Sequence, residues 1–143
     1  MFCISIANEE QNLAQYMLSM AGIKFKFAQN NKKCDFLLIN NGIFGDKINV
    51  EASIILANSN WLKEIKNYNI CGNVISYGLN EKDCITASSI GDNDMQICIQ
   101  RSISFANGKT CVPQEIKVPL NKDYNTELQI GIHSIIILAK MLQ

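Results

Sequence analysis

The stretch at residues 74–90 divides this chain into two parts of different character. An apolar run ends at Tyr77-Gly78, polar residues at 80–83 form a turn signal, and a second strand-like run continues to Ile90. Before this stretch, apolar runs of strand length alternate with helical periodicity, which predicts parallel strands joined by helices. After it come short apolar runs separated by turn residues, which predict antiparallel strands. The sequence therefore predicts a sheet whose strand direction changes at this stretch.

The size and composition of the chain favour a single globular domain. Its 143 residues match one ordinary domain, so we expect one domain spanning residues 1–143. The sequence is 48% apolar and 18% charged, which is typical of globular proteins. Its 13 basic and 13 acidic residues cancel, and only Arg101 is an arginine. Because nucleic-acid binding depends on a basic patch, we expect no nucleic acid among the partners.

Three features of the sequence predict a cytoplasmic protein without membrane contact. The longest apolar run, at residues 135–139, is far too short to cross a bilayer. The first residues lack the pattern of a signal peptide. The six cysteines form no Cys-x-x-Cys pair, and most lie in apolar runs, as free thiols do. We therefore expect a reducing compartment, the cytoplasm.

The expected elements follow from the spacing of apolar residues. Strands are expected at residues 2–7, 23–27, 34–39, 52–57, 74–78, 84–90, 95–100, 103–105 and 110–118. Helices are expected after a cap at Asn8, after a cap at Ser59 or Asn60, and at residues 125–142. Together they predict a three-layer α/β fold, with a mostly parallel sheet, flanking helices and an antiparallel portion at residues 84–118.

Two of the expected helices carry apolar faces. The predicted face of the first helix consists of Leu13, Tyr16, Met17 and Met20. The last helix has a main apolar stripe that Ile130, Ile136 and Ile137 widen, made of Leu128, Ile132, Ile135, Leu138, Ala139 and Leu142. A helix that is apolar over so much of its surface packs against a sheet or a partner. Self-association through residues 128–142 is therefore one hypothesis for this chain.

Two motifs that could carry chemistry have structural explanations. The segment Asn107-Gly108-Lys109-Thr110 ends like a phosphate-binding loop, but the glycine required five residues before Gly108 is replaced by Ile103. The segment also lies between two expected strands, and Asn-Gly is a strong hairpin signal. The only histidine, His133, is interpreted as a core or helix-surface residue. We assign no catalytic residue, no metal site and no cofactor.

Polar residues follow two of the apolar strands expected in the parallel part of the sheet. Asn40 follows one of them, and Asn58 and Asn60 follow the next. In open α/β sheets, ligands bind at the edge formed by the carboxyl ends of the strands. These three asparagines are therefore candidate ligand-binding residues.

The chain from about residue 51 onward resembles the central domain of Mur ligases, the ATP-dependent amide-forming enzymes of peptidoglycan synthesis. The segments that carry the resemblance are residues 55–60, 74–78, 84–90, Val118-Pro119-Leu120 and Tyr124-Asn125. In that family a His-Asn pair opens a long helix, so the resemblance adds Tyr124 and Asn125 to the candidate ligand-binding residues. It implies a role related to the bacterial cell wall.

The chain also departs from the Mur ligase pattern. The family's Gly-rich phosphate loop is expected near the start of the domain, but residues 2–10 contain no glycine. The acidic residues that follow the family's asparagine are replaced by Ser59 and Asn60. The family's carboxyl-terminal domain has no counterpart after Gln143. Because phosphoryl transfer depends on positioning and neutralising the phosphates, this chain has no visible source of ligase activity.

Three functional hypotheses follow. The leading one is a non-catalytic, Mur-ligase-like domain that binds a small ligand or a protein partner. The alternative is an enzyme, or part of a split enzyme, that acts on a nucleotide-sugar or peptide cell-wall precursor at the strand-end loops. The third is the self-associating module described above, with the last helix as its interface.

Overall fold

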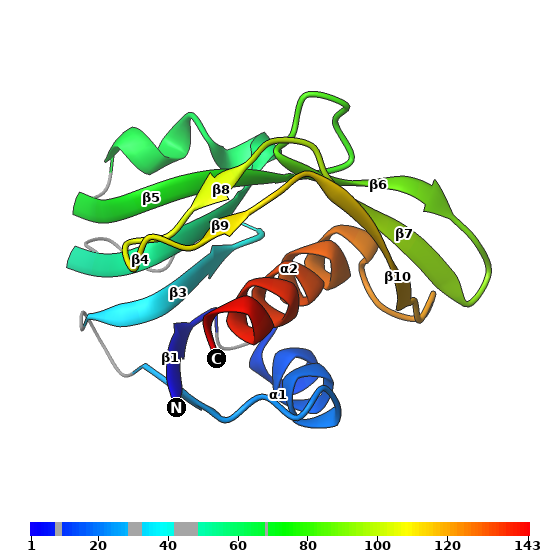
Figure 1. The fold of residues 1–143 in the computed structure, drawn as a ribbon, viewed down its shortest axis with the longest axis horizontal. Coiled ribbons are helices and arrows are strands. Elements are labelled where there is room, and N and C mark those ends of the chain that lie inside the picture. The colour runs from blue at the N-terminus through cyan, green and yellow to red at the C-terminus, as the bar shows by residue number, and fades with distance from the viewer. Residues whose placement is uncertain (8–9, 29–32, 42–48, 68) are drawn as a thin grey trace.

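The protein is built on one twisted eight-stranded sheet with α-helices against one of its faces (Figure 1). The computed structural model describes residues 1–7, 10–28, 33–41, 49–67 and 69–143. The strands are β1 (Phe2–Ser5), β2 (Phe25–Phe27), β3 (Cys34–Ile39), β4 (Asn49–Asn58), β5 (Asn69–Gly78), β6 (Ile85–Ile90), β7 (Asp94–Ile99), β8 (Ile103–Ser104), β9 (Thr110–Cys111) and β10 (Gln114–Pro119). The helices are α1 (Gln11–Met20), α2 (Thr126–Leu142) and the short 3-10 helices η2 (Ser59–Trp61) and η3 (Glu64–Asn67).

The direction of the strands changes where the sequence predicts it. The sheet order is β10-β7-β6-β5-β4-β3-β1-β2, and every neighbouring pair from β2 through β6 is parallel. The last two strands, β7 and β10, are antiparallel to their neighbours. The predicted α/β class and mostly parallel sheet are therefore confirmed. The hairpin predicted at Asn107-Gly108 joins β8 and β9, which form a separate two-stranded sheet, and Gly108 has the positive φ of 87° that such a turn requires.

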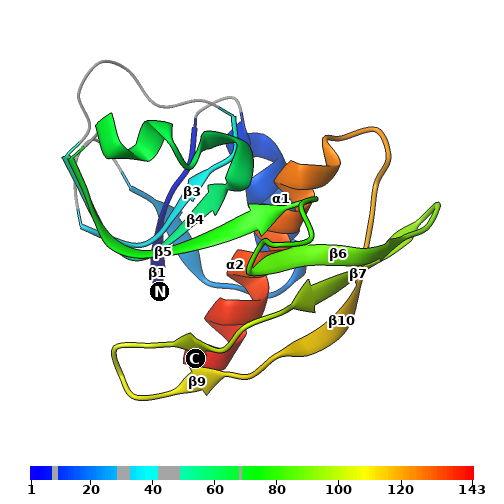
Figure 2. The same ribbon diagram turned by 90° about the horizontal axis from the view of Figure 1, so that it is seen from above.

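The two faces of the sheet are covered unequally. Both α-helices lie on one face, and η2 and η3 lie on the other (Figure 2). On the thinner side, Trp61 and Ile65 pack on a small core that includes Leu37, Ile39 and Ile55. Of the three predicted layers, the third consists of two 3-10 helices in the described part of the chain.

Helix α2 is the centre of the larger core. Its residues are buried without interruption from Leu128 to Ala139. It can lie close to the sheet because Gly131 faces Leu38 and Tyr77, where an added Cβ would approach their side chains to 2.7 and 2.8 Å. The wide apolar stripe that motivated the self-association hypothesis is thus buried inside the chain. No helix among the described residues is long and apolar enough to span a membrane.

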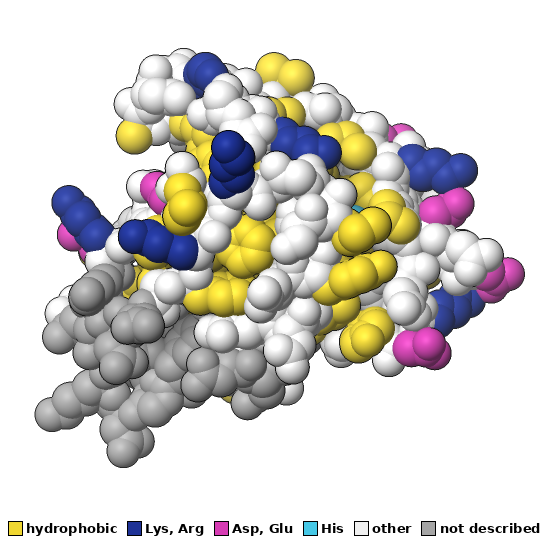
Figure 3. All heavy atoms as spheres, turned by 90° about the horizontal axis from the view of Figure 1, so that it is seen from below, with side chains coloured by type: hydrophobic (Ala, Val, Ile, Leu, Met, Phe, Trp, Pro, Cys, Tyr) yellow, Lys and Arg dark blue, Asp and Glu magenta, His cyan; other side chains and the backbone are white. Residues whose placement is uncertain are grey.

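The apolar face predicted for the first helix is confirmed at Leu13 and Met17, which pack against the core, and wrong at Tyr16 and Met20. The residues of α1 that are buried against the core are Ala14 and Leu18. Tyr16 and Met20 are exposed instead. Hydrophobic side chains reach the surface in the view from below, the side on which α1 lies (Figure 3).

Two further expectations differ from the structure. The helix expected after Asn58 is replaced by η2 and η3, and it is Asn58 itself, not Ser59 or Asn60, that caps η2. The strand expected at residues 110–118 is two strands, because the chain leaves the ladder around Pro113, which has no N–H to donate. The expected helix cap Asn8 lies outside the described residues, and α1 begins at Gln11.

We expect Gly131→Ala to destabilise the protein by about 1–3 kcal/mol, because the added methyl group overpacks the contact with Leu38 and Tyr77. In an ordinary helix the same change stabilises by up to about 1 kcal/mol, so the sign of the effect is diagnostic. Urea unfolding measures the change. The control is Lys140→Ala on the exposed side of α2, expected within about 0.5 kcal/mol of wild type.

The single histidine makes stability depend on pH. His133 is buried, its Nε2 lies 2.9 Å from the carbonyl oxygen of Pro119, and burial lowers its pKa below the ordinary value of 6.5. The unfolded chain therefore binds a proton at a pH where the folded chain does not, so stability falls as the pH drops below about 6.5. We expect His133→Gln to lose less stability than wild type between pH 7.5 and 5.5 in urea unfolding. An equal loss in both proteins would contradict this role.

Candidate functional site

The carboxyl ends of β3, β4 and β5 lie side by side and bring polar side chains together. Asn40 directly follows β3, Asn58 ends β4, and Tyr77 is the penultimate residue of β5. The register sets Ile39 of β3 beside Ala57 of β4, and Asn58 of β4 beside Tyr77 of β5. The edge of a parallel sheet at which ligands bind is therefore polar in this protein.

Five side chains at this edge form one hydrogen-bonded set, which we name the strand-end network: Glu10, Asn40, Asn58, Tyr77 and Glu127. Asn40 donates from Nδ2 to Glu10 Oε1 at 3.3 Å. Asn58 donates from Nδ2 to Asn40 Oδ1 at 3.3 Å and to Glu127 Oε2. The Tyr77 hydroxyl donates to Asn40 Oδ1 at 2.7 Å. The two asparagines therefore link two carboxyl groups into one chain of contacts.

The two glutamates enter the network from the amino-terminal ends of the α-helices. Glu10 is the residue immediately before α1, and Glu127 lies in the first turn of α2. Carboxylates are favoured at these positions because helix amino termini carry partial positive charge. Asn125 fixes the start of α2, since its Oδ1 accepts a hydrogen bond from Leu128 N at 2.8 Å. The carboxyl groups of the network therefore come from the starts of the two α-helices, and its amide groups come from the ends of β3 and β4.

Burial and charge together keep Tyr77 protonated. Its side chain is fully buried, and Asn40 and Asn58 are only 7% and 3% exposed. Burial first, and then the charges of Glu10 and Glu127, raise the pKa of Tyr77 well above its ordinary value of 10. The phenol is therefore a permanent hydrogen-bond donor, and the potential around it is negative.

Asp83 is a further carboxyl group beside the network, and it is buried. Asp83 Oδ2 accepts hydrogen bonds from Ser59 Oγ at 3.2 Å and from Asn80 N at 3.1 Å. Burial raises the pKa of Asp83, against the lowering effect of these hydrogen bonds. Gly78 leaves room for the carboxyl group, because a Cβ there would lie 2.9 Å from Asp83 Oδ2. Together with the two glutamates, Asp83 gives this edge of the sheet an acidic character.

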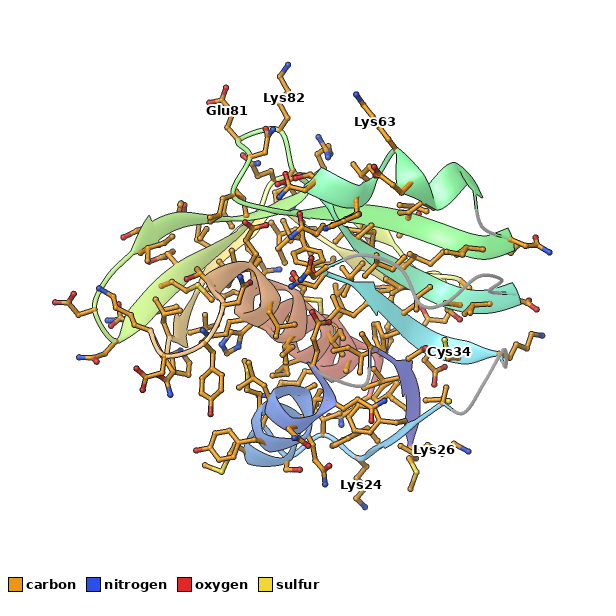
Figure 4. All side chains as sticks on the ribbon, turned by 180° about the vertical axis from the view of Figure 1, so that it is seen from behind. Lys24, Lys26, Cys34, Lys63, Glu81 and Lys82 are labelled. Carbon is orange, nitrogen blue, oxygen red and sulfur yellow. The ribbon has the colours of Figure 1, made fainter. Side chains whose placement is uncertain are left out.

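Basic side chains near this edge in the sequence face away from it. Lys63 follows η2, and Lys82 lies in the turn between β5 and β6. Both are exposed and extend outward from the molecule, as does Glu81 beside Lys82 (Figure 4). Neither lysine therefore neutralises the carboxyl groups of the network.

The structure brings only some of the sequence candidates together. Asn40 and Asn58 are bonded to each other, whereas Asn60 reaches Asn58 only through its backbone N–H, at 3.0 Å, and has an exposed side chain. Asn125 acts through the helix cap described above. Tyr124 is 51% exposed, and in the described part of the chain its hydrogen bonds are those of its backbone with Asn121 and Gln129.

Sequence reasoning did not single out Glu10, Tyr77 or Glu127. Each has a local signal, because Tyr77 ends an apolar strand and both glutamates stand at helix starts. What the sequence could not supply is their convergence, since Asn58 and Glu127 are 69 residues apart. Within the described residues, no group of three or more His, Cys, Asp or Glu side chains is arranged to hold a metal ion.

Comparison with protein-family models, with curated proteins and with solved structures finds no match for this chain. The Mur ligase resemblance therefore rests on the sequence segments alone.

Asn58 is the residue on which we expect the network to depend. Asn58→Ala removes the amide that serves Asn40 and Glu127 and the oxygen that caps η2. Because buried polar partners are then left unsatisfied, we expect a loss of about 2–4 kcal/mol in the free energy of unfolding, measured with urea. The matched control is Asn60→Ala, two residues away and exposed, for which we expect a change within about 0.5 kcal/mol.

Proposed function

We propose that the protein is a non-catalytic binding domain of the Mur ligase central-domain type, which takes a small polar ligand at the carboxyl edge of β3, β4 and β5. One observation carries this proposal. Five side chains from five different parts of the chain converge at that edge in the strand-end network. Such a set of convergent polar groups at strand ends is typical of ligand sites in α/β proteins.

The polar groups of the edge select the chemistry of the ligand. Glu10, Glu127 and Asp83 offer acceptors, and the charge of Glu127 contributes to the raised pKa of both Tyr77 and Asp83. A ligand rich in hydrogen-bond donors, with hydroxyl, amide or ammonium groups, complements this edge. A triphosphate is disfavoured, because its charges would be repelled by the carboxylates.

The interior of the network favours a binding role over catalysis. Both polar atoms of the Asn58 amide are engaged by the protein, with Nδ2 bonded to Asn40 and Glu127 and Oδ1 bonded to Asn60 N. Asn58 is thus buried and saturated, whereas Asn41 and Asn60, which follow Asn40 and Asn58 closely in the chain, are exposed. The missing Gly-rich phosphate loop is consistent with this role, because ATP-dependent chemistry needs a group that holds the phosphates.

Calorimetry of the purified chain tests the proposal. The titrants are ATP, a nucleotide-sugar precursor of peptidoglycan and a peptide precursor with a free ammonium group. We expect saturable binding of a precursor and none of ATP. Asn60→Ala should weaken that binding about threefold to tenfold without changing stability, since one hydrogen bond is worth about 0.5–1.5 kcal/mol.

The control for this experiment is Asn93→Ala. Asn93 is also exposed but lies in the turn between β6 and β7, so we expect the affinity of wild type. Formation of an amide from ATP and the precursors by the purified chain would establish the enzyme alternative and overturn the non-catalytic role. The proposal would also be contradicted if neither of the two precursors bound saturably.

A further inference from the structure

A cavity of about 450 Å³ lies at the amino-terminal ends of β1, β3, β4 and β5, at the opposite end of these strands from the strand-end network. Its volume is in the range of about 300–1,000 Å³ that is usual for small-molecule sites. Its walls carry three of the six cysteines together with three charged residues: Cys3, Cys34, Cys71, Lys33, Asp35 and Glu51. We name it the thiol cavity.

Small residues leave room in the wall of the thiol cavity that β4 and β5 form. The pairing of these two strands changes register between Glu51 and Ile54. At this point a Cβ on Gly72 would collide with the carbonyl oxygen of Ala52, so the two backbones approach as closely as glycine allows. Ala52 and Gly72 both line the cavity, and neither fills the space beside the cysteines.

Cys71 is the thiol of this cavity that a bound molecule can reach. All six cysteines are in the described part of the chain, and Cys71 is the only one with an exposed side chain. Cys34 is buried, and burial, followed by the neighbouring Cys3 and Asp35, raises its pKa to about 12. The thiol of Cys34 therefore stays protonated near neutral pH and is a poor nucleophile. The nucleophile of the cavity is Cys71.

No other thiol of the cavity is close enough to form a disulfide with Cys71. Cys34 pairs with Ala52 on one side of β4, and Cys71 pairs with Glu51 on the other side. Two strand spacings separate their Cα atoms by about 10 Å, whereas a disulfide requires less than about 7 Å. Cys3 lies one strand farther away, on β1. A disulfide at Cys71 therefore needs a second sulfur from another molecule.

The charges beside Cys71 indicate the chemistry of that molecule. Glu51 is the neighbour of Cys71 across the two strands, so both side chains lie on the same face of the sheet. Lys33 Nζ lies 3.6 Å from Glu51 Oε1, and both side chains are exposed. Such an exposed ion pair is weak, so a ligand can open it at little cost. A zwitterion fits this pair, because its ammonium group can bind Glu51 and its carboxylate can bind Lys33.

We propose that the thiol cavity binds a small zwitterionic disulfide and that Cys71 forms a mixed disulfide with one half of it. The Cys71 thiol loses its proton, and Sγ attacks one sulfur of the bound disulfide. A new S–S bond joins Cys71 to that half, and the original S–S bond breaks. The other half leaves as a thiolate and takes up a proton. Cys71 is thereby oxidised and the leaving half is reduced.

This site is separate from the proposed ligand site. The strand-end network lies at the carboxyl ends of the same strands, and none of its five side chains lines the thiol cavity. Loss of ligand binding at the network would therefore leave the reaction of Cys71 unchanged, so the two proposals fail independently.

The rates of two disulfides test whether the cavity recognises the zwitterion. The purified chain is incubated with cystine, which is zwitterionic, or with bis(2-hydroxyethyl) disulfide, which is neutral, and the products are followed by mass spectrometry. We expect one mixed disulfide per chain, at Cys71. The ratio of the cystine rate to the neutral rate should be at least about threefold higher than for a free, uncharged model thiol, from the strength of an exposed ion pair. An equal ratio would show that exposure alone makes Cys71 react, and would overturn the proposal.

Variants locate the reaction and its charge recognition. Cys71→Ser should abolish the mixed disulfide, whereas Cys98→Ser, on β7, should leave it unchanged. Lys33→Gln should lower the rate ratio about threefold, because the carboxylate of cystine loses its partner. The matched control is Lys63→Gln, since Lys63 extends outward and away from Cys34 (Figure 4). Faster modification of another cysteine, or an unchanged ratio in Lys33→Gln, would contradict the proposal.

Discussion

The contact between α2 and the middle of the sheet is the constraint on which the rest of the structure depends. Gly131 allows the helix to lie directly on Tyr77 and Leu38. The same placement buries the apolar stripe of α2 and carries Glu127, one turn earlier, to the end of β4, where it meets Asn58. Tyr77 takes part in both arrangements, with its ring against the helix and its hydroxyl bonded to Asn40. Core packing and the polar site are therefore coupled, because a helix held farther from the sheet would no longer position Glu127.

Much of the fold follows from local pattern in the sequence. Apolar runs such as residues 34–39 and 52–57 coincide with β3 and with most of β4, since a strand covered on both faces has little room for polar residues. The last helix is placed correctly from its cap at Asn125 and its wide apolar stripe. These features are set by neighbouring residues, so no knowledge of the tertiary structure is needed to recognise them.

The errors arise where tertiary contacts decide between local alternatives. In α1, the spacing of Tyr16 and Met20 is as helical as that of Ala14 and Leu18, and only the position of the sheet decides which pair is buried. The site shows the same limit. Asn40 and Asn58 could be selected as strand-end residues, but the carboxylates they bind come from the starts of two helices distant in sequence. Local patterns therefore indicate the edge of the sheet at which a site lies, and not the side chains that complete it.

The polar site and the unpaired side of β5, which β6 pairs with only at Tyr77 and Gly78, share one structural cause, the short connection between β5 and β6. Six residues, 79–84, separate the two strands, too few to carry the chain back along β5, so a parallel β6 can pair only with the last two residues of β5. The earlier part of β5 is left without a neighbour on that side. The same tight turn folds Asp83 under Gly78 and against Ser59, beside the network. A longer connection with its own helix, as in an ordinary parallel crossover, would both cover the edge and displace this carboxyl group. One short turn thus adds acidic character to the strand ends and exposes a neutral edge of the sheet.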